Sequence, residues 1–284
     1  MGALLSLVNR RRFSNRMYVL LAASSFLIAL IPLVSIIYYT LAQGYVALSF
    51  DFFTQVTPPI GGEGGGILNA IEGSFVMVAI ASVFGIPIGV FAGAYLSEYP
   101  GKFAYYVRLL SEVLTGVPSI VTGIFVYELI VVTQHRFSAL SGGIALGFMM
   151  IPIVAISTHE SLKLVPSQIK EGALALGISR TKTVLHVLLS TAKSSIVTGI
   201  ALAVARVMGE TAPLLFTALG SQFLMTGLND PAASLTLLIF DFGTAPYENA
   251  HRFAWGAALI LLLIVLSLNV ALRLATRRKF SIAE

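Results

Sequence analysis

The sequence predicts an all-α integral membrane protein with six transmembrane helices and both termini in the cytoplasm. Of its 284 residues, 57% are hydrophobic and only 11% are charged, whereas a soluble domain carries about 25% charged residues. The mean hydropathy is +0.89. Six apolar stretches are long enough to cross a hydrocarbon core, which takes about 20 helical residues. The composition therefore excludes an ordinary soluble domain.

Each stretch carries features that fit a membrane helix. The first follows an arginine cluster, as a secretory signal does, but its apolar core exceeds the usual length of about 7–15 residues and no small-residue cleavage site follows. Pro87, Pro118 and Pro152 predict kinks within the next three stretches. Trp255 suits an interfacial anchor at the exterior start of the last one. We place the spans near Met17–Leu41, Ile67–Leu96, Leu109–Val132, Leu140–Ser157, Ala192–Met225 and Phe253–Ala275.

The basic residues predict the orientation, because cytoplasmic loops of membrane proteins are enriched in Lys and Arg. With both termini inside, 15 of the 18 Lys and Arg residues are cytoplasmic, against Arg136 and Arg252 outside and Arg206 within a span. The orientation of the chain in the membrane thus accounts for the basic residues that give the net charge of +5. Nucleic-acid binding would need a basic face with stacking aromatics, and none is visible. The cytoplasmic residues are Arg10, Arg11, Arg12, Arg16, Lys102, Arg108, Lys163, Lys170, Arg180, Lys182, Lys193, Arg273, Arg277, Arg278 and Lys279.

The exterior segments, residues 42–66 and 226–252, are predicted to be irregular connections without a folded domain. They are rich in turn formers such as Pro58-Pro59 and Asn229-Asp230-Pro231. The glycine-rich run at 61–66 is not followed by Lys-Ser/Thr, so it is not a phosphate-cradling loop. We interpret it as a flexible connector.

The cytoplasmic segment between the fourth and fifth spans, residues 158–191, contains a predicted short helix. Pro166 suits its first turn and Gly177 its C-terminal exit. Ile169, Ala173 and Leu176 recur at i, i+4 and i+7 and form one apolar stripe. So short a helix needs something to pack against. A headgroup-bound interfacial helix and a docking surface for a cytoplasmic partner fit this pattern equally well.

Two charged residues interrupt the fifth stretch. Arg206 and Glu210 are spaced i, i+4, so on one helix they would share a face and could form a partly neutralising pair. Gly209 and Pro213 flank the glutamate and predict a loosened helix that frees backbone groups beside a cavity. A buried pair that only holds helices together is the structural alternative. Intramembrane ionisable residues more often mark a functional site.

The chemistry of these two side chains suits a protonated oxyanion. A guanidinium binds oxyanions through a planar fork of donors and stays charged at every relevant pH. A carboxylate accepts a proton. Phosphate near neutral pH keeps an O–H group that sulfate lacks, so Arg206 and Glu210 together predict a path that favours phosphate over sulfate.

Other chemistries lack the residues they need. The chain has no cysteine, which excludes disulfides and thiolate metal sites. Its four histidines are scattered: His135, His159, His186 and His251. No Walker motif is present, because Gly101-Lys102 is followed by Phe103 rather than Ser or Thr. An intramembrane enzyme using Glu210 would lack a nucleophile–base constellation. A self-contained channel or ion-coupled carrier stays open as an alternative to a permease that is driven by a partner.

The cytoplasmic loop resembles that of ABC-importer permeases. Glu171-Gly172-Ala173, followed by Gly177, is similar to their Glu-Ala-Ala…Gly motif. In that family the loop forms a coupling helix that fits a groove on the ATP-hydrolysing subunit. Gly172 replaces the first alanine, which costs the helix up to ~1 kcal/mol, and Leu189-Ser190 stands where the family usually has Leu-Pro.

Several motifs narrow the resemblance to the PstA-type permease subunits of bacterial phosphate ABC importers. One departure lies near the end of the fourth span, where Ala155-Ile156 and Thr158-His159-Glu160 replace an Arg and a Thr-Glu-Glu of that family. The similar segments are Gly65-Gly66-Ile67, Asn69-Ala70-Ile71, Tyr95-Leu96-Ser97-Glu98-Tyr99, Gly116-Val117-Pro118-Ser119-Ile120-Val121, Gly123-Ile124-Phe125, Leu164-Val165-Pro166-Ser167, Ala173-Leu174-Ala175-Leu176-Gly177 and Gly209-Glu210-Thr211-Ala212-Pro213-Leu214-Leu215-Phe216-Thr217-Ala218.

The resemblance implies a type I ABC-importer permease of the MetI-like fold in the bacterial plasma membrane, with no catalysis and no cofactor of its own. Its partners would be a PstC-type second permease, two ATP-binding subunits that use ATP and Mg²⁺, an exterior phosphate-binding protein and membrane lipid. The substrate path would include Arg206, Glu210 and Thr211. Contacts with the ATPase would come from Ile169, Glu171, Gly172, Ala173, Leu176 and Gly177.

The whole chain is then expected to be one permease domain. Residues 1–66 would hold the cytoplasmic N-terminus, the first span and the glycine-rich loop. Residues 67–275 would form a five-span core that includes the coupling loop at 158–191, and residues 276–284 a basic tail. Import of another oxyanion, such as sulfate, molybdate or phosphonate, is the main alternative function.

Overall fold

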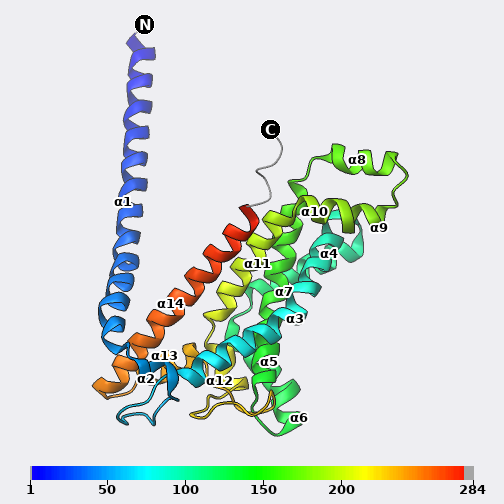
Figure 1. Cartoon of the computed structure of the whole chain (residues 1–284). Coiled ribbons are helices and arrows are strands. Elements are labelled where there is room, and N and C mark those ends of the chain that lie inside the picture. The colour runs from blue at the N-terminus through cyan, green and yellow to red at the C-terminus, as the bar shows by residue number, and fades with distance from the viewer. Residues whose placement is uncertain (1, 278–284) are drawn as a thin grey trace.

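The computed structural model describes the backbone of residues 2–277 and the side chains of Arg11, residues 14–272 and Leu274. This part of the chain is helical, and its only β pairing is an isolated parallel bridge between Leu219 and Ala232. Figure 1 shows long helices running between the two ends of an elongated bundle. The elements are α1 (Gly2–Ala47), α2 (Phe50–Thr54), α3 (Leu68–Glu98), α4 (Lys102–Gly116), α5 (Ser119–Val126), η1 (Tyr127–Val131), α6 (Val132–Gln134), α7 (Ala139–Lys163), α8 (Ser167–Ala175), α9 (Arg180–Lys182), η2 (Thr183–Leu188), α10 (Leu189–Thr191), α11 (Lys193–Met208), α12 (Ala212–Thr217), α13 (Leu235–Gly243) and α14 (Glu248–Arg277).

The predicted all-α membrane class is confirmed. Four helical segments are long and apolar enough to cross a membrane: Ser14–Ala47, Leu68–Glu98, Ala139–Lys163 and Glu248–Leu272. Two bent pairs, Lys102–Gly116 with Ser119–Gln134 and Arg180–Thr191 with Lys193–Met208, make up to six spans when each pair counts as one. The fourth span continues as helix to Lys163, beyond the predicted end at Ser157.

The third predicted span is not a continuous helix. It bends by 105° between α4 and α5, where Val117 has extended backbone angles. Pro118 explains the break, because it has no N–H for a helical hydrogen bond and disfavours helical geometry at the residue before it.

The fifth predicted span is also interrupted and is shorter than expected. The helix at its start, α11, is bent by 74° relative to the preceding helical stretch Arg180–Thr191, and Ala192 lies at the bend. The predicted loosening near Gly209 is confirmed, since α11 ends at Met208. The predicted extension to Met225 is wrong, because the short α12 is followed by a loop that runs to Ser234.

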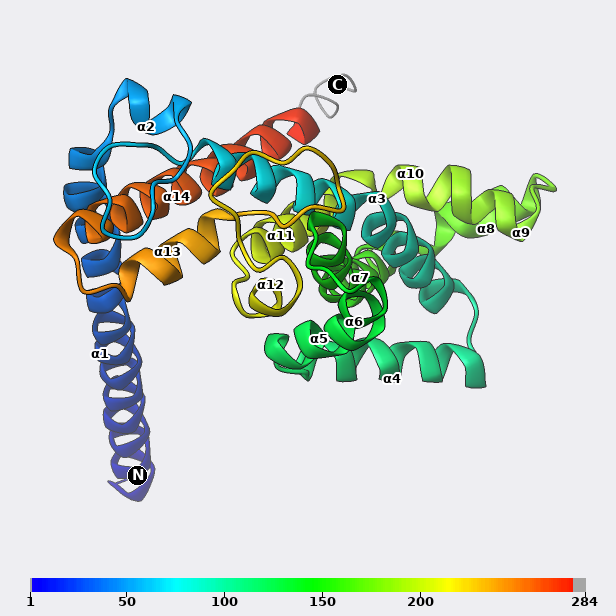
Figure 2. The same ribbon diagram turned by 90° about the horizontal axis from the view of Figure 1, so that it is seen from below.

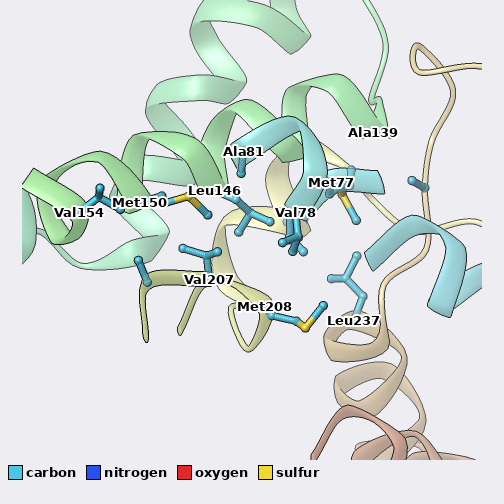
Figure 3. Close-up of a cluster of buried hydrophobic side chains, with 14 residues drawn as sticks. Met77, Val78, Ala81, Ala139, Leu146, Met150, Val154, Val207, Met208 and Leu237 are labelled. Carbon is cyan, nitrogen blue, oxygen red and sulfur yellow. The ribbon is translucent and has the colours of Figure 1, made fainter. Parts of the chain in front are cut away.

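The centre of the bundle is formed by α3 and α7, with α11 against them. Buried Met77 and Val78 of α3 meet Leu146 and Met150 of α7, and Val207 of α11 points into the same cluster (Figure 3). The backbones of α3 and α7 also approach closely at the α8 end of the bundle. Small residues permit such close packing between membrane helices.

The exterior segments contain more structure than the sequence predicts. Both hold a short helix, α2 and α13, and each helix begins at a serine whose hydroxyl accepts a backbone N–H: Ser49 from Phe52 and Ser234 from Leu237, both at 3.1 Å. Both serines are therefore N-caps. In segments rich in turn formers, such a cap is difficult to recognise from the sequence. Buried Asn69 ties the first of these segments to the loop after α12, because its amide accepts from Thr57 and donates to the Ser221 carbonyl.

Helix α1 stands apart from the bundle over most of its length (Figures 1 and 2). None of its membrane-length window is buried within this chain. Only its last turns pack, where Gly44 lies directly against Trp255 and Leu259 of α14. The N-terminal end of α1, the C-terminal end of α14 and α8 all lie at one end of the bundle (Figure 1), as the predicted orientation requires. The side chains of Arg10, Arg12, Arg273, Arg277, Arg278 and Lys279, and the tail beyond Arg277, lie outside the described residues.

Gly93 tests the close packing of α3 on α7. A Cβ atom there would lie 2.4 Å from the Ala155 carbonyl oxygen and 2.6 Å from the Thr158 Cβ. We expect Gly93→Ala to destabilise the protein by about 1–3 kcal/mol through overpacking. Gly116→Ala is the control, because nothing lies within 4 Å of a Cβ at that position. Thermal unfolding of both purified variants checks this, and equal midpoints would contradict the packing argument.

Candidate functional site

The segment from Gly209 to Thr211 breaks the fifth span between α11 and α12. The N–H of Gly209 donates to the Arg206 carbonyl at 3.1 Å, and the N–H of Glu210 donates to the Val207 carbonyl at 3.2 Å. These i to i+3 hydrogen bonds tighten and end the helix. Pro213 then lies in the first turn of α12. Backbone N–H groups in a first turn have no acceptor within the helix, so the missing N–H of proline does not destabilise it there. The break therefore follows directly from the Gly and Pro that flank the glutamate.

Contacts from two other elements hold this break in place. The Thr236 hydroxyl, at the start of α13, donates to the Glu210 carbonyl at 2.9 Å. Buried Pro213 lies against Gly123 of α5, so closely that a Cβ at Gly123 would lie 2.6 Å from the Pro213 Cα. Two glycine- and proline-containing motifs that are far apart in the sequence thus form one junction between the two broken spans.

Arg206 and Glu210 do not form the predicted pair. The prediction that the two residues share a helix face is wrong, because α11 ends at Met208 and Glu210 lies beyond it. Within the described residues, neither side chain has an ion pair within 4.0 Å or a side-chain hydrogen bond. Arg206 is exposed and Glu210 is half-buried. Thr211 is also half-buried, and its hydroxyl makes no capping hydrogen bond to α12.

Arg206 lies on an uncovered face of α11 that the sequence analysis missed. The exposed residues Ser195, Thr198, Leu202 and Arg206 follow one another at spacings of three or four and share one helix face. Beside it is a cavity of about 510 Å³ between α7, α11 and α14. The spacing of Ser195, Thr198 and Arg206 is visible in the sequence, but only the exposure of these side chains in the structure shows that the face is uncovered. Polar groups of the cavity wall include Ser157, Glu160, Ser161, Ser195, Thr198 and Asn269.

The helix predicted within residues 158–191 is present as α8. Pro166 precedes its first residue, Ser167. At its end the N–H of Gly177 donates to the Leu174 carbonyl at 3.0 Å, and the N–H of Ile178 donates to the Ala173 carbonyl at 3.2 Å. This is a Schellman motif, and it needs the left-handed φ of +78° that Gly177 adopts.

The apolar stripe of α8 is only partly covered by this chain. Ala173 is buried, whereas Ile169 is 37% exposed and Leu176 is 83% exposed. Glu171 and Gly172 are also exposed. In Figure 1, α8 projects from one end of the bundle, on the loop that connects α7 to α9 and α10. The stripe therefore presents two large apolar side chains at the tip of the loop.

Three of the five residues at which the sequence departs from the PstA-type pattern are buried, whereas Ile156 is half-buried and Glu160 is exposed. Ala155, Thr158 and His159 lie in the half of α7 nearest α8. The Thr158 hydroxyl and the His159 Nδ1 have no hydrogen-bond partner among the described residues. The described residues also contain no group of three or more His, Cys, Asp or Glu that could hold a metal ion.

Residues 85–280 match the family described as "Binding-protein-dependent transport system inner membrane component". The chain is 42% identical to the phosphate transport system permease protein PstA of Haemophilus influenzae, over 95% of this chain and 96% of that protein. It is 35% identical to the probable PstA of Methanocaldococcus jannaschii, over 94% and 95% of the two chains. This chain belongs to the PstA permease family. The predicted resemblance is therefore confirmed.

Solved structures of more distant ABC transporters share the fold of this PstA-family chain. An inward-facing MetNI methionine transporter matches with a TM-score of 0.59 at 18% identity, over 74% of this chain and 92% of that chain. A bacterial alginate transporter, in complex with its alginate-bound periplasmic protein, matches with a TM-score of 0.65 at 12% identity, over 94% and 96%. The predicted MetI-like permease fold is confirmed.

Two glycines of the α8 segment are expected to respond oppositely to alanine. Gly172 is helical and open, with nothing within 4 Å of a Cβ, so Gly172→Ala should stabilise α8 by up to ~1 kcal/mol. Gly177→Ala should destabilise it by a similar amount, about 1 kcal/mol, because φ is positive there. Amide hydrogen exchange in α8 should slow up to about fivefold in the first variant and accelerate in the second. Exchange changes of the same sign in both variants would contradict this assignment.

Proposed function

We propose that this chain is the membrane-spanning permease subunit of an ATP-driven importer of inorganic phosphate. The observation that carries this proposal is its identity of 35–42% to PstA phosphate permeases from bacteria and an archaeon, along nearly the whole chain. The broken span with Arg206, Glu210 and Thr211 adds chemistry that fits an oxyanion path.

Arg206 provides transient charge compensation for the anion as it crosses. Its side chain has no partner among the described residues, and a guanidinium can bind two phosphate oxygens at once. The hydroxyl of Thr211 supplies a further donor, and the carboxylate of Glu210 accepts the proton that phosphate carries. Binding at these groups has to be weak enough for release.

The energy for transport arrives through α8. Ile169, Ala173 and Leu176 supply its apolar surface, and Glu171, Gly172 and Gly177 complete the motif that contacts the ATPase. We assign the use of ATP and Mg²⁺ to that partner, because the sequence of this chain holds no Walker motif. Closure of the ATPase pair moves the coupling helices, and the path then changes the face to which it opens.

The complete transporter contains this chain, a PstC-type second permease, two ATP-binding subunits and an exterior phosphate-binding protein. It resides in lipid in the bacterial plasma membrane, with both termini and α8 on the cytoplasmic side. The chain acts as one permease domain. Residues 67–275 form its core, residues 158–191 its coupling loop, residues 1–66 its N-terminal span and exterior loop, and residues 276–284 its basic tail.

Uptake of labelled phosphate by cells that carry the whole transporter tests the function and the role of Arg206. We expect wild-type uptake to resist excess sulfate, and Arg206→Gln to lower uptake at least tenfold at matched membrane levels, because the path loses its cation. Arg136→Gln is the matched control, since Arg136 is an exposed loop residue.

Each result has a distinct meaning. An assembled wild-type transporter that takes up sulfate, molybdate or a phosphonate instead of phosphate would reassign the substrate. Uptake without the ATPase would favour a channel or ion-coupled carrier. Normal uptake by Arg206→Gln would keep the phosphate permease and remove Arg206 from the path.

Glu210 is expected to set the discrimination between the two anions. Removing its charge in Glu210→Gln removes both the proton acceptor and the repulsion of a fully deprotonated anion. Sulfate should therefore compete with phosphate uptake about tenfold more strongly than in the wild type. Competition curves at several sulfate concentrations measure this, and unchanged curves would show that the selectivity resides elsewhere.

A further inference from the structure

A buried carboxylate connects the coupling loop to the end of α3. Glu98 is the last residue of α3 and is only 6% exposed. The Nζ of Lys170, in α8, lies 2.6 Å from its Oε2, an ion pair although the ammonium group is not aligned for a hydrogen bond. A carboxylate at a helix C-terminus is disfavoured by the helix dipole, and a buried charge needs a partner. Lys170 supplies that partner from the middle of the coupling helix.

A second cation of the loop binds the same helix end. The guanidinium of Arg180, the first residue of α9, donates to the backbone carbonyl of Glu98, one of the carbonyls that a helix end leaves without an internal donor. Arg180 also lies 4.6 Å from the ring centroid of Tyr99, within the range of a cation–π contact. Tyr99 in turn stacks on Tyr95 at 5.2 Å. The loop is thus attached to α3 on both sides of the Glu171–Gly177 motif.

The other end of α3 is bonded to the segment that holds the broken span. The Ser74 hydroxyl accepts the N–H of Leu235 at 2.8 Å. The residue after Leu235, Thr236, donates its hydroxyl to the Glu210 carbonyl. Since α3 is a helix of 31 residues, it spans about 46 Å. One continuous helix therefore joins the Lys170 contact to the segment that is bonded to the Glu210 break.

We propose that Glu98, Lys170 and Arg180 form a latch through which movement of α8 displaces α3, and that α3 carries this movement to the Glu210 break. The inference rests on the proposed function, because it assigns the route from the coupling helix to the anion path. Lys170 and Glu98 act here as positioning residues. They hold the coupling loop rigidly on α3, so that the loop cannot move alone.

The transporter reconstituted with all its subunits tests the latch when phosphate uptake and ATP hydrolysis are measured together. Lys170→Gln and Glu98→Gln should lower the phosphate transported per ATP about tenfold, while ATP hydrolysis stays within about threefold of the wild type. Lys170→Arg, which keeps the charge, should restore the ratio. Lys182→Gln is the matched control, because Lys182 is exposed on the same loop and has no ion pair among the described residues.

A second measurement does not depend on which anion is carried. In the same assembled complexes, Lys170→Gln should accelerate amide exchange at Gly209, Glu210 and Leu235 at least threefold relative to Lys182→Gln. Wild-type coupling and wild-type exchange in Lys170→Gln would overturn the latch. Loss of ATPase binding in that variant would also overturn it, because the pair would then serve only to shape the docking loop. A wild-type complex that transports no phosphate, but shows the exchange difference, would reject the substrate and keep the latch.

Discussion

The need to satisfy every backbone N–H and C=O inside a hydrocarbon layer governs this structure, because no water is available there as a partner. Long helices solve the problem for most of the chain. Where a helix breaks, side chains and neighbouring backbone replace the lost hydrogen bonds. The Glu210 carbonyl receives the Thr236 hydroxyl, and the Thr217 carbonyl receives the Ser141 hydroxyl at 2.7 Å and the Ser138 N–H at 3.0 Å. At these two places the irregular backbone is bonded by other elements of the chain.

This constraint explains how a charged site is built inside an apolar fold. The break at Gly209–Thr211 is held in place by α5 and α13, one by packing against Pro213 and the other by the Thr236 hydroxyl. Of the two side chains that are most costly to bury, Arg206 is exposed and Glu210 is half-buried at the edge of the break. The protein core therefore fixes the backbone of the break and leaves the Arg206 side chain uncovered by the described part of this chain.

Other elements also supply the partners of a buried polar group at the opposite end of α3. Glu98 is buried at the helix end, and both of its cationic contacts come from the loop that carries α8. The packing of α3 on α7 leaves little room for the two helices to slide. The loop that carries α8 is thus attached to a closely packed pair of helices.

The sequence by itself determined the membrane class, most of the spans and the bounds of α8, because these depend on hydropathy and on single residues. Pro166 and Gly177 mark the two ends of α8 through local backbone geometry alone. Likewise Gly209 and Pro213 predicted a loosened helix. Only the tertiary structure decided the rest. It left Arg206 and Glu210 without the expected contact, one on α11 and the other beyond the end of that helix. It folded α13 in an exterior segment whose turn-rich sequence concealed its Ser234 cap, and it paired Glu98 with Lys170 across 72 positions of the chain. The Glu98–Lys170 pair joins residues that are distant in sequence, and its formation depends on which helices pack together, so no local pattern could have shown it.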